Sequence, residues 1–367
     1  METFFNRFGI TLNTRKMRSR YFSLQNRWKL SRKRVERLVG AFLLSGVVLG
    51  FLPDEGFDGS RNTVLGTNNY SGANIIEATI PPTLTLTPTP EIGVVKGIAS
   101  FKDLNNLVAA PELFPDSALP PEVTAQAALF IDQASGAVLY EKNPKKPFPP
   151  ASTTKMMTAI ISMELYSLSE TVTVPESCTA LSGTQRMGLL TGENISVENL
   201  LSGLIIQSAA DAACALASHG GDVSEFIEKM NNKAEALGLE ETKFSNPIGL
   251  DAFNGDINYS SASDLVLLAN EFIKNPFLFE TMQIKNKNVF SEDTTISHRL
   301  RTTNELLSEN SGFIGIKTGQ TQLAKGCFVS LVRKGERTVI GVVLGSDDRF
   351  GETKRLVDWI FSVYSWP

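Results

Sequence analysis

The segment Ser152-Thr-Thr-Lys155 places a hydroxyl group and a primary amine three residues apart. On a helix, side chains at this spacing lie on one face, and the two groups can approach each other. A lysine can act as the base for a serine nucleophile when burial or a nearby cation lowers the pKa of its amine toward neutrality. A helix that begins at Ser152 would also direct free backbone N–H groups at the atom under attack. The pair therefore predicts nucleophilic catalysis by serine, with lysine as the base.

The chain contains two histidines, His219 and His298, which limits the alternatives to a lysine base. His219 follows an alanine-rich helical pattern and precedes two glycines, a common place for a histidine that caps a helix. His298 lies in a polar, strand-like stretch, with no G-x-S-x-G motif nearby. We interpret both as structural, which argues against a Ser-His-Asp triad. Two histidines are too few for a histidine-rich metal site, and we predict no metal or other cofactor.

Two further motifs follow the first at long range, Gln207-Ser-Ala-Ala-Asp211 and Gly315-Ile-Lys-Thr-Gly319. An isolated S-x-x-K occurs by chance in many proteins. The ordered set of S-x-x-K, a second serine motif and K-T-G is typical of penicillin-binding proteins and class A β-lactamases. The order of the three motifs therefore carries more weight than any one of them.

From about Gln126 to Tyr364 the chain resembles the low-molecular-mass penicillin-binding proteins that act as D-alanyl-D-alanine carboxypeptidases. The resemblance covers almost the whole C-terminal part. The matching blocks are Ala128-Leu-Phe-Ile-Asp132, Gly136-Ala-Val-Leu-Tyr-Glu-Lys-Asn143, Pro150-Ala-Ser-Thr-Thr-Lys-Met156, Leu204-Ile-Ile-Gln-Ser208, Phe244-Ser-Asn-Pro-Ile-Gly-Leu250 and Gly315-Ile-Lys-Thr-Gly319.

The resemblance implies catalytic roles for three residues. Ser152 is expected to attack the carbonyl carbon of the penultimate D-alanine of a peptidoglycan stem pentapeptide. The terminal D-alanine then leaves, and water hydrolyses the acyl-enzyme. Lys155 is expected to accept the serine proton, and Ser208 to relay a proton to the leaving amine. The family also implies inhibition by β-lactams.

The K-T-G motif carries the expected substrate contacts. The resemblance implies that Lys317 and Thr318 hold the terminal carboxylate of the substrate. Gly319 belongs to the same motif, and Gln320 follows it. The backbone N–H groups of Ser152 and Gln320 are expected to form the oxyanion hole.

The second motif departs from the family pattern. The family usually has Ser-x-Asn, whose amide contacts the substrate and the lysine beside the nucleophile, whereas this chain has Ala210 at the asparagine position. Loss of such a contact costs about 1 to 3 kcal/mol where a buried partner is left unpaired. We therefore expect reduced or altered turnover. The family position of Asp211 makes it a structural residue and not a substitute for the asparagine.

Two rival functions remain open. A class A β-lactamase shares these motifs but needs a carboxylate that drives deacylation. Glu228 and Asn232 have suitable spacing, but they belong to an amphipathic helical pattern, and we expect Glu228 on its solvated face. The other rival binds stem peptides or penicillin with little turnover, as Ala210 suggests. Retention of Ser152, Lys155, Ser208 and Lys317 argues against it.

Charge and composition divide the chain into four parts. Residues 1–37 carry eleven basic and two acidic residues, which leaves 24 of the 35 basic and 37 of the 39 acidic residues for the remainder. An acidic body without a basic face is unlike a nucleic-acid-binding protein, so we predict no nucleic-acid partner. We expect a cytoplasmic segment at 1–37, an apolar segment at 38–53, a flexible Pro/Thr-rich linker at 54–120 and a catalytic domain at 121–367.

The apolar run Leu38–Leu52 follows a basic cluster and has 15 residues. Basic residues stay on the cytoplasmic side of a membrane, so the C-terminal body is expected outside the cytoplasm. The run is shorter than the roughly 20 residues of a typical span and falls in the range of a signal-peptide core. The long basic region and the lack of a small-x-small cleavage site favour an uncleaved single-pass anchor. Cleavage and secretion remain the alternative.

The body reads as strands at both ends with helices between them. Apolar runs separated by turn residues predict hairpins at 127–140 and 326–344. Helical patterns cover 153–166, 196–205, 211–218, 224–237, 263–273 and the C-terminal end, and Ser208 falls at a helix junction. We predict an α+β (mixed α/β) fold of the β-lactamase/transpeptidase type, with a mainly antiparallel sheet flanked by helices. The three cysteines, Cys178, Cys214 and Cys327, are widely separated and odd in number, so we predict no disulfide framework, and we interpret Cys214 and Cys327 as small buried side chains.

Overall fold

The structure is a computed structural model that describes residues 108–251, 257–308 and 312–367. The segments predicted as a cytoplasmic region, a membrane anchor and most of the linker lie outside the described residues. No helix among the described residues combines the length and the apolar character that crossing a bilayer requires.

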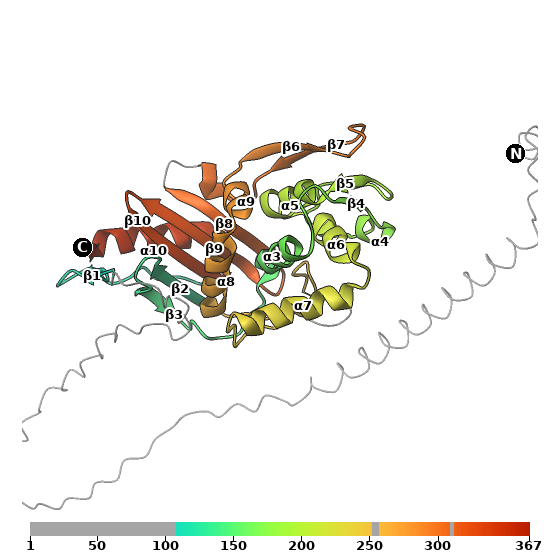
Figure 1. The fold of residues 1–367 in the computed structure, drawn as a ribbon. Coiled ribbons are helices and arrows are strands. Elements are labelled where there is room, and N and C mark those ends of the chain that lie inside the picture. Colours follow the sequence, from blue (N-terminus) through green and yellow to red (C-terminus); the bar gives the residue numbers. More distant parts are fainter. Residues whose placement is uncertain (1–107, 252–256, 309–311) are drawn as a thin grey trace, which may run out of the picture. The chain divides into compact units, whose positions relative to one another are not determined.

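A five-stranded antiparallel sheet forms the centre of the fold, in the order β3-β2-β10-β9-β8 (Figure 1). The two ends of the body meet in it, because β2 from the start pairs with β10 from the end, Leu129 opposite Val342. This arrangement confirms both predicted hairpins and the α+β class. The strands are β2 (Ala127–Asp132), β3 (Val138–Lys142), β8 (Phe313–Thr321), β9 (Lys325–Lys334) and β10 (Arg337–Ser346).

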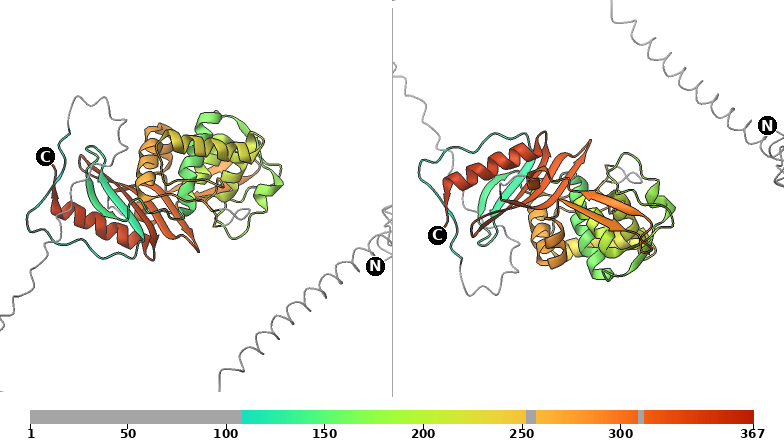
Figure 2. Two further views of the ribbon diagram at one scale, coloured as in Figure 1. Left: turned by 90° about the horizontal axis from the view of Figure 1, so that it is seen from below. Right: turned by 90° about the horizontal axis from the view of Figure 1, so that it is seen from above.

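Helices cover both faces of this sheet (Figure 2). The closing helix α10 (Arg349–Val363) packs its apolar stripe of Leu356, Val357 and Ile360 on one face. Helix α8 (Ala262–Lys274) packs on the other face, against β2, β9 and β10. The core is therefore divided into two apolar layers by the sheet.

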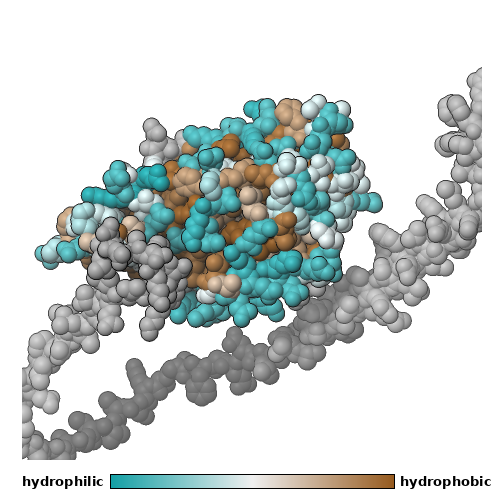
Figure 3. Space-filling model, in the orientation of Figure 1, coloured by the Kyte–Doolittle hydropathy of each residue, from teal (hydrophilic) through white to brown (hydrophobic). Residues whose placement is uncertain are grey.

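A mainly helical region adjoins the sheet on the α8 side (Figure 1). Its surface along α7 is largely hydrophilic, as the lower edge of Figure 3 shows. Two small antiparallel pairs, β4–β5 and β6–β7, border this region. Its elements are α3 (Lys155–Leu165), β4 (Thr171–Thr173), α4 (Glu176–Thr179), β5 (Asn194–Ser196), α5 (Val197–Ile206), α6 (Ala210–His219), α7 (Val223–Ala236), α9 (Pro276–Thr281), β6 (Asn286–Phe290) and β7 (Ser297–Arg301), with short 3₁₀ helices η1 (Ala151–Thr154) and η2 (Glu305–Ser308).

The junction between α5 and α6 confirms the predicted place of Ser208. Ser196 caps α5 by accepting the N–H of Asn199 at 3.3 Å, and α5 ends at Ile206. Ser208 itself has a left-handed backbone with φ of +59°, a conformation that most residues avoid. The helical pattern predicted from residue 211 begins one residue earlier in the structure, because α6 starts at Ala210. The carboxylate of Asp211 mainly serves another segment, described below.

A disulfide joins Cys178 of α4 to Cys214 of α6, so our interpretation of these cysteines as unpaired was wrong. The two residues are 36 positions apart in sequence, yet their Cα atoms lie 5.4 Å apart. Only the packing of α4 against α6 brings them together, and a one-turn helix such as α4 leaves little periodic signal in the sequence. Cys327 is unpaired and buried, as predicted, and burial raises the pKa of its thiol to about 12.

The last residues of the predicted linker contact the C-terminal end. Strand β1 (Glu112–Leu113) pairs with β11 (Tyr364–Ser365), and Trp359 Nε1 donates to the carbonyl of Ala118 at 2.7 Å. These contacts extend the folded body upstream of Pro121.

Candidate active site

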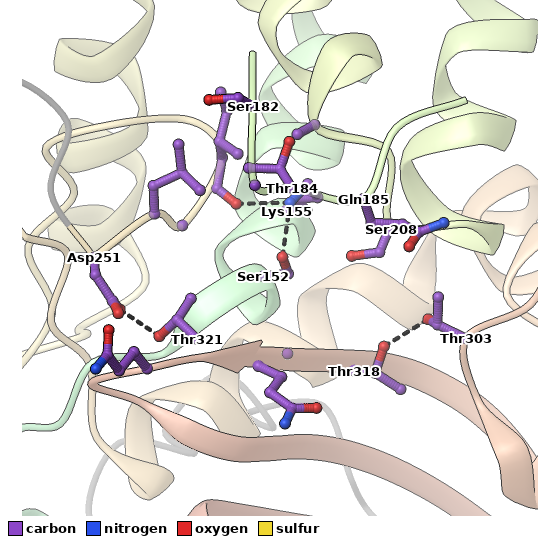
Figure 4. Close-up of a pocket in the computed structure, with 18 of the residues that line it drawn as sticks. Ser152, Lys155, Ser182, Thr184, Gln185, Ser208, Asp251, Thr303, Thr318 and Thr321 are labelled. Atoms are coloured by element: carbon purple, nitrogen blue, oxygen red, sulfur yellow. Dashed lines mark hydrogen bonds between the residues drawn. The ribbon is translucent and has the colours of Figure 1, made fainter. Parts of the chain in front are cut away.

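One cleft of about 630 Å³ collects most of the predicted site residues. It lies where the edge strand β8, the start of α3 and the α5–α6 junction meet (Figure 4). The lining includes Ser152, Lys155, Ser208, Thr318, Gly319 and Gln320. Lys317 joins the group through its hydrogen bond with Ser208.

The Ser152–Lys155 pair has the predicted contact. Lys155 Nζ donates to Ser152 Oγ at 2.8 Å and to the carbonyl oxygen of Ile248 at 2.7 Å (Figure 4). Ser152 lies on the 3₁₀ turn η1, directly before α3. Side chains three residues apart eclipse one another on a 3₁₀ turn, which brings the hydroxyl and the amine together.

Burial tunes the amine of Lys155. Its side chain is 1 % exposed, and this desolvation lowers its pKa to about 7, while the negative charge of Asp211 acts in the opposite direction. A free amine therefore exists near neutral pH. In its unprotonated form the amine can keep a hydrogen on the carbonyl of Ile248 and direct its lone pair at the serine hydroxyl.

A second hydroxyl–amine pair faces the first. Lys317 Nζ donates to Ser208 Oγ at 2.7 Å and to the backbone oxygen of Thr318 at 3.0 Å. Burial, the nearby amine of Lys155 and the guanidinium of Arg349 lower the pKa of Lys317 well below its usual value. Two amines in one buried space disfavour simultaneous protonation.

Glycines allow the backbone segments to approach the nucleophile closely. A Cβ on Gly319 would lie 3.0 Å from both the Cβ of Ala151 and the backbone nitrogen of Ser152. Gly249 has φ of +83°, and a Cβ there would lie 2.0 Å from the carbonyl oxygen of Ala151. Ala151 itself has φ of +49°. The turn that carries Ser152 is thus held between two segments that pack against it without side chains.

The structure adds cleft residues that the sequence analysis missed. Thr303 shares a 2.6 Å hydrogen bond with Thr318, and Asp251 accepts the hydroxyl of Thr321. Arg349 donates to the side-chain oxygen of Gln320 at 2.6 Å. Asp251 directly follows a matched block, which was the available signal for it. Arg349 is brought in by the pairing of distant strands, and nothing local in the sequence marks it.

The loop 182–185 also lines the cleft and was missed. In Figure 4, Ser182 and Thr184 lie above the Ser152–Lys155 pair, and Gln185 lies to its right, beside Ser208. The carboxylate of Asp211 accepts backbone N–H groups from the next three residues, 187–189, at 2.9 to 3.1 Å. Ala210, also in the cleft lining, is 1 % exposed.

The two histidines lie outside the cleft lining, as predicted. His219 contacts Glu170 at 2.7 Å, and His298 is buried against Glu193 at 2.7 Å. Glu228 is exposed on α7, also as predicted. Within the ranges that the structure describes, no group of three or more His, Cys, Asp or Glu side chains is placed to hold a metal ion.

Comparison with known proteins agrees with this geometry. The family model described as D-alanyl-D-alanine carboxypeptidase, peptidase S11, matches residues 115–348. The chain belongs to this family. This finding confirms the resemblance drawn from the three motifs.

Individual relatives show the same relationship. The chain is 34% identical over 249 residues to the D-alanyl-D-alanine carboxypeptidase DacF of Bacillus subtilis, and 35% identical over 259 residues to DacC of Escherichia coli. These alignments cover 65% and 66% of this chain, and 63% of each relative.

The solved structure of the Streptomyces K15 DD-transpeptidase superposes with a TM-score of 0.63 at 30% identity. The match covers 67% of this chain and 100% of that one. The body therefore has the transpeptidase/β-lactamase-like α+β fold.

The packing at Gly249 leads to a testable prediction. We expect Gly249→Ala to lower the free energy of unfolding more than Gly238→Ala, in urea titrations of both variants. Gly238 also has a positive φ, of +70°, but nothing lies within 4 Å of a Cβ there. The control should cost about 1 kcal/mol from backbone strain alone. Overlap with Ala151 should add at least about 1 kcal/mol at Gly249. Equal losses of unfolding free energy in the two variants would show that the turn at Ala151 moves to accept the added methyl group at no cost.

Proposed function

We propose that this protein is a serine D-alanyl-D-alanine carboxypeptidase that removes the terminal D-alanine from peptidoglycan stem pentapeptides. The observation that carries this proposal is the buried Lys155 amine, 2.8 Å from the Ser152 hydroxyl, with a pKa of about 7. A serine hydroxyl becomes a useful nucleophile when a neighbouring base can take its proton. Family membership supports the reaction type.

Acylation uses the two hydroxyl–amine pairs in sequence. Ser152 Oγ attacks the carbonyl carbon of the penultimate D-alanine while its proton moves to Lys155. The bond to the terminal D-alanine nitrogen then breaks, and that nitrogen receives a proton through Ser208, which is hydrogen-bonded to Lys317. Water subsequently hydrolyses the Ser152 ester and releases the shortened peptide.

The floor of the cleft suits a substrate that ends in a carboxylate. Arg349 lines the cleft and supplies positive charge, and the buried amine of Lys317 is hydrogen-bonded to the lining residue Ser208. Thr318 and Thr303 also line the cleft, with their hydroxyls bonded to each other. A bound carboxylate would favour the protonated form of Lys317 that burial disfavours in the free protein. Binding of a substrate that ends in a carboxylate thus favours protonation of Lys317, which provides the proton that the leaving amine needs.

Backbone N–H groups complete the proposed machinery. We assign the oxyanion hole to Ser152 and Gln320. The absence of a side chain at Gly319 supports this assignment, because it lets β8 approach the backbone nitrogen of Ser152. Each oxyanion donor typically contributes about 10²- to 10³-fold to the rate.

Covalent labelling of Ser152 tests the proposal. Mass spectrometry of residues 108–367 incubated with a pentapeptide ending in D-Ala-D-Ala should show release of one D-alanine. Benzylpenicillin should add its full mass to the peptide that contains Ser152. Ser152→Ala should abolish both results, because it removes the attacking oxygen, whereas Ser167→Ala, at an exposed serine just after α3, should abolish neither.

Other outcomes would favour the rival functions. Rapid hydrolysis of benzylpenicillin, without a lasting adduct, would identify a β-lactamase. A stable adduct with no release of D-alanine would identify a penicillin-binding domain with little turnover.

The lowered pKa of Lys155 predicts a pH dependence. Acylation requires the unprotonated amine, so its rate constant should be nearly constant above pH 7 and fall about tenfold per pH unit below it. Stopped-flow acylation by benzylpenicillin between pH 5 and 10 measures this profile, with circular dichroism to confirm folding at each pH. An inflection near 10, the ordinary range of a lysine, would contradict the role of Lys155.

We also propose that the body works outside the cytoplasm, attached to the membrane by the apolar segment 38–53. The basic residues that precede this segment and the acidic body that follows support that orientation. The Cys178–Cys214 disulfide supports it independently, since such bonds persist mainly in oxidising compartments.

Fractionation of cells that produce the full chain tests this localisation. The intact protein should sediment with membranes and resist extraction by salt, and an external protease should degrade it in cells without an outer barrier. Replacing 38–53 with a cleavable signal peptide should release the body into the medium. Recovery of the unaltered chain from the soluble cytosol would refute the anchor.

A further inference from the structure

The side chain of Gln185 lines the active-site cleft close to Ser208 (Figure 4). Its residue is exposed, and its carboxamide has no hydrogen bond to any other described residue. Of the other two glutamines of the lining, Gln320 is paired with Arg349 at 2.6 Å. Gln322, which also has no side-chain hydrogen bond among the described residues, follows Thr321, which is bonded to Asp251. Gln185 therefore offers a free amide donor and acceptor in the part of the cleft that contains Ser208.

The backbone around Gln185 is fixed, although its side chain is not. The carbonyl of Gln185 accepts the N–H of Ala210 at 2.8 Å. The side chain of Gln207 donates to the carbonyl of Arg186 at 2.7 Å. The carboxylate of Asp211 accepts the N–H groups of residues 187–189. The loop is thus bound along its length to the junction that contains Ser208 and Ala210.

Ala210 itself offers no polar side chain to this wall of the cleft. A stem peptide in the cleft brings a backbone amide on the acyl side of the bond that is cut. If that amide loses water without gaining a partner, binding and turnover suffer. A glutamine reaches further than an asparagine by one methylene, and the Gln185 backbone starts one hydrogen bond away from Ala210. The same functional group can therefore reach this space from the neighbouring loop.

We propose that the carboxamide of Gln185 binds the backbone amide of the stem peptide on the acyl side of the scissile bond, in place of a side chain at Ala210. This assignment rests on the proposed carboxypeptidase activity and adds a substrate-binding residue to it.

Two penicillins separate this role from a structural one. Benzylpenicillin carries an amide on its acyl side, whereas 6-aminopenicillanic acid has a free amine there. Gln185→Leu should slow acylation by benzylpenicillin, and lower kcat/KM for the pentapeptide, by about 10- to 100-fold. Acylation by 6-aminopenicillanic acid should change less than about threefold, because Ser152 and Lys155 are untouched. Gln283→Leu, at an exposed glutamine outside the cleft lining, is the control and should leave both rates within about threefold of wild type.

A rescue variant tests whether the origin of the amide matters. Ala210→Asn introduced into Gln185→Leu should recover at least tenfold of the lost rate with benzylpenicillin. The melting temperature of each variant is measured. That of Gln185→Leu should stay close to the wild-type value, because Gln185 is exposed. The double variant places a larger side chain at a buried position, so its rate is compared per fraction of folded, labelled protein.

Three outcomes would overturn the role of Gln185. They are an unchanged rate of benzylpenicillin acylation in Gln185→Leu, an equal loss with both penicillins, and no recovery in the folded double variant. Failure of the underlying function would look different. Wild-type protein would then neither release D-alanine nor form an acyl-enzyme with either penicillin.

Discussion

The contact between the Lys155 amine and the Ser152 hydroxyl depends on burial of the amine, because water would favour its protonated form. Desolvation of a lysine is unfavourable for its charged form, and the fold tolerates it because the amine still has two hydrogen-bond partners, Ser152 and the carbonyl of Ile248. That carbonyl is positioned by Asn246, whose side-chain oxygen accepts the N–H groups of residues 248–250. The lowered pKa of this amine is therefore a product of tertiary packing, since the S-x-x-K spacing alone would leave an ordinary surface lysine.

Strained backbone accompanies both serines, at Ser208 itself and at Ala151, the residue before Ser152. Ala151 and Ser208 adopt left-handed conformations, with φ of +49° and +59°, in a body where such residues are mostly glycines. Each is opposed by segments that pack closely, Gly249 and Gly319 at the first and the Lys317 amine at the second. Unfavourable backbone conformations persist where surrounding contacts determine them, and they concentrate at functional sites. Here they bring two hydroxyls to one cleft, each hydrogen-bonded to a buried lysine amine.

Much of the fold was predictable from local patterns, and the site only in part. Periodicity located the hairpins, the helices and the junction at Ser208, because each is determined by residues close together in the chain. The residues Thr303 and Arg349 were not predictable, since they reach the cleft through the packing of distant segments. The disulfide was missed for the same reason: 36 residues separate its cysteines, and their meeting depends on how α4 packs on α6.

The segment 180–189 contains Gln185, whose carbonyl accepts the N–H of Ala210, and it is restrained by the disulfide close to it. Residues 180–189 follow α4, which Cys178 ties to α6, and Asp211 at the start of α6 accepts three N–H groups from the end of that segment. Both ends of the segment are thus attached to one helix. A loop held in this way loses little further conformational freedom when a ligand binds, so its side chains can act with nearly the precision of a helix residue. This restraint makes it physically reasonable for a loop glutamine to do what a helix asparagine does elsewhere.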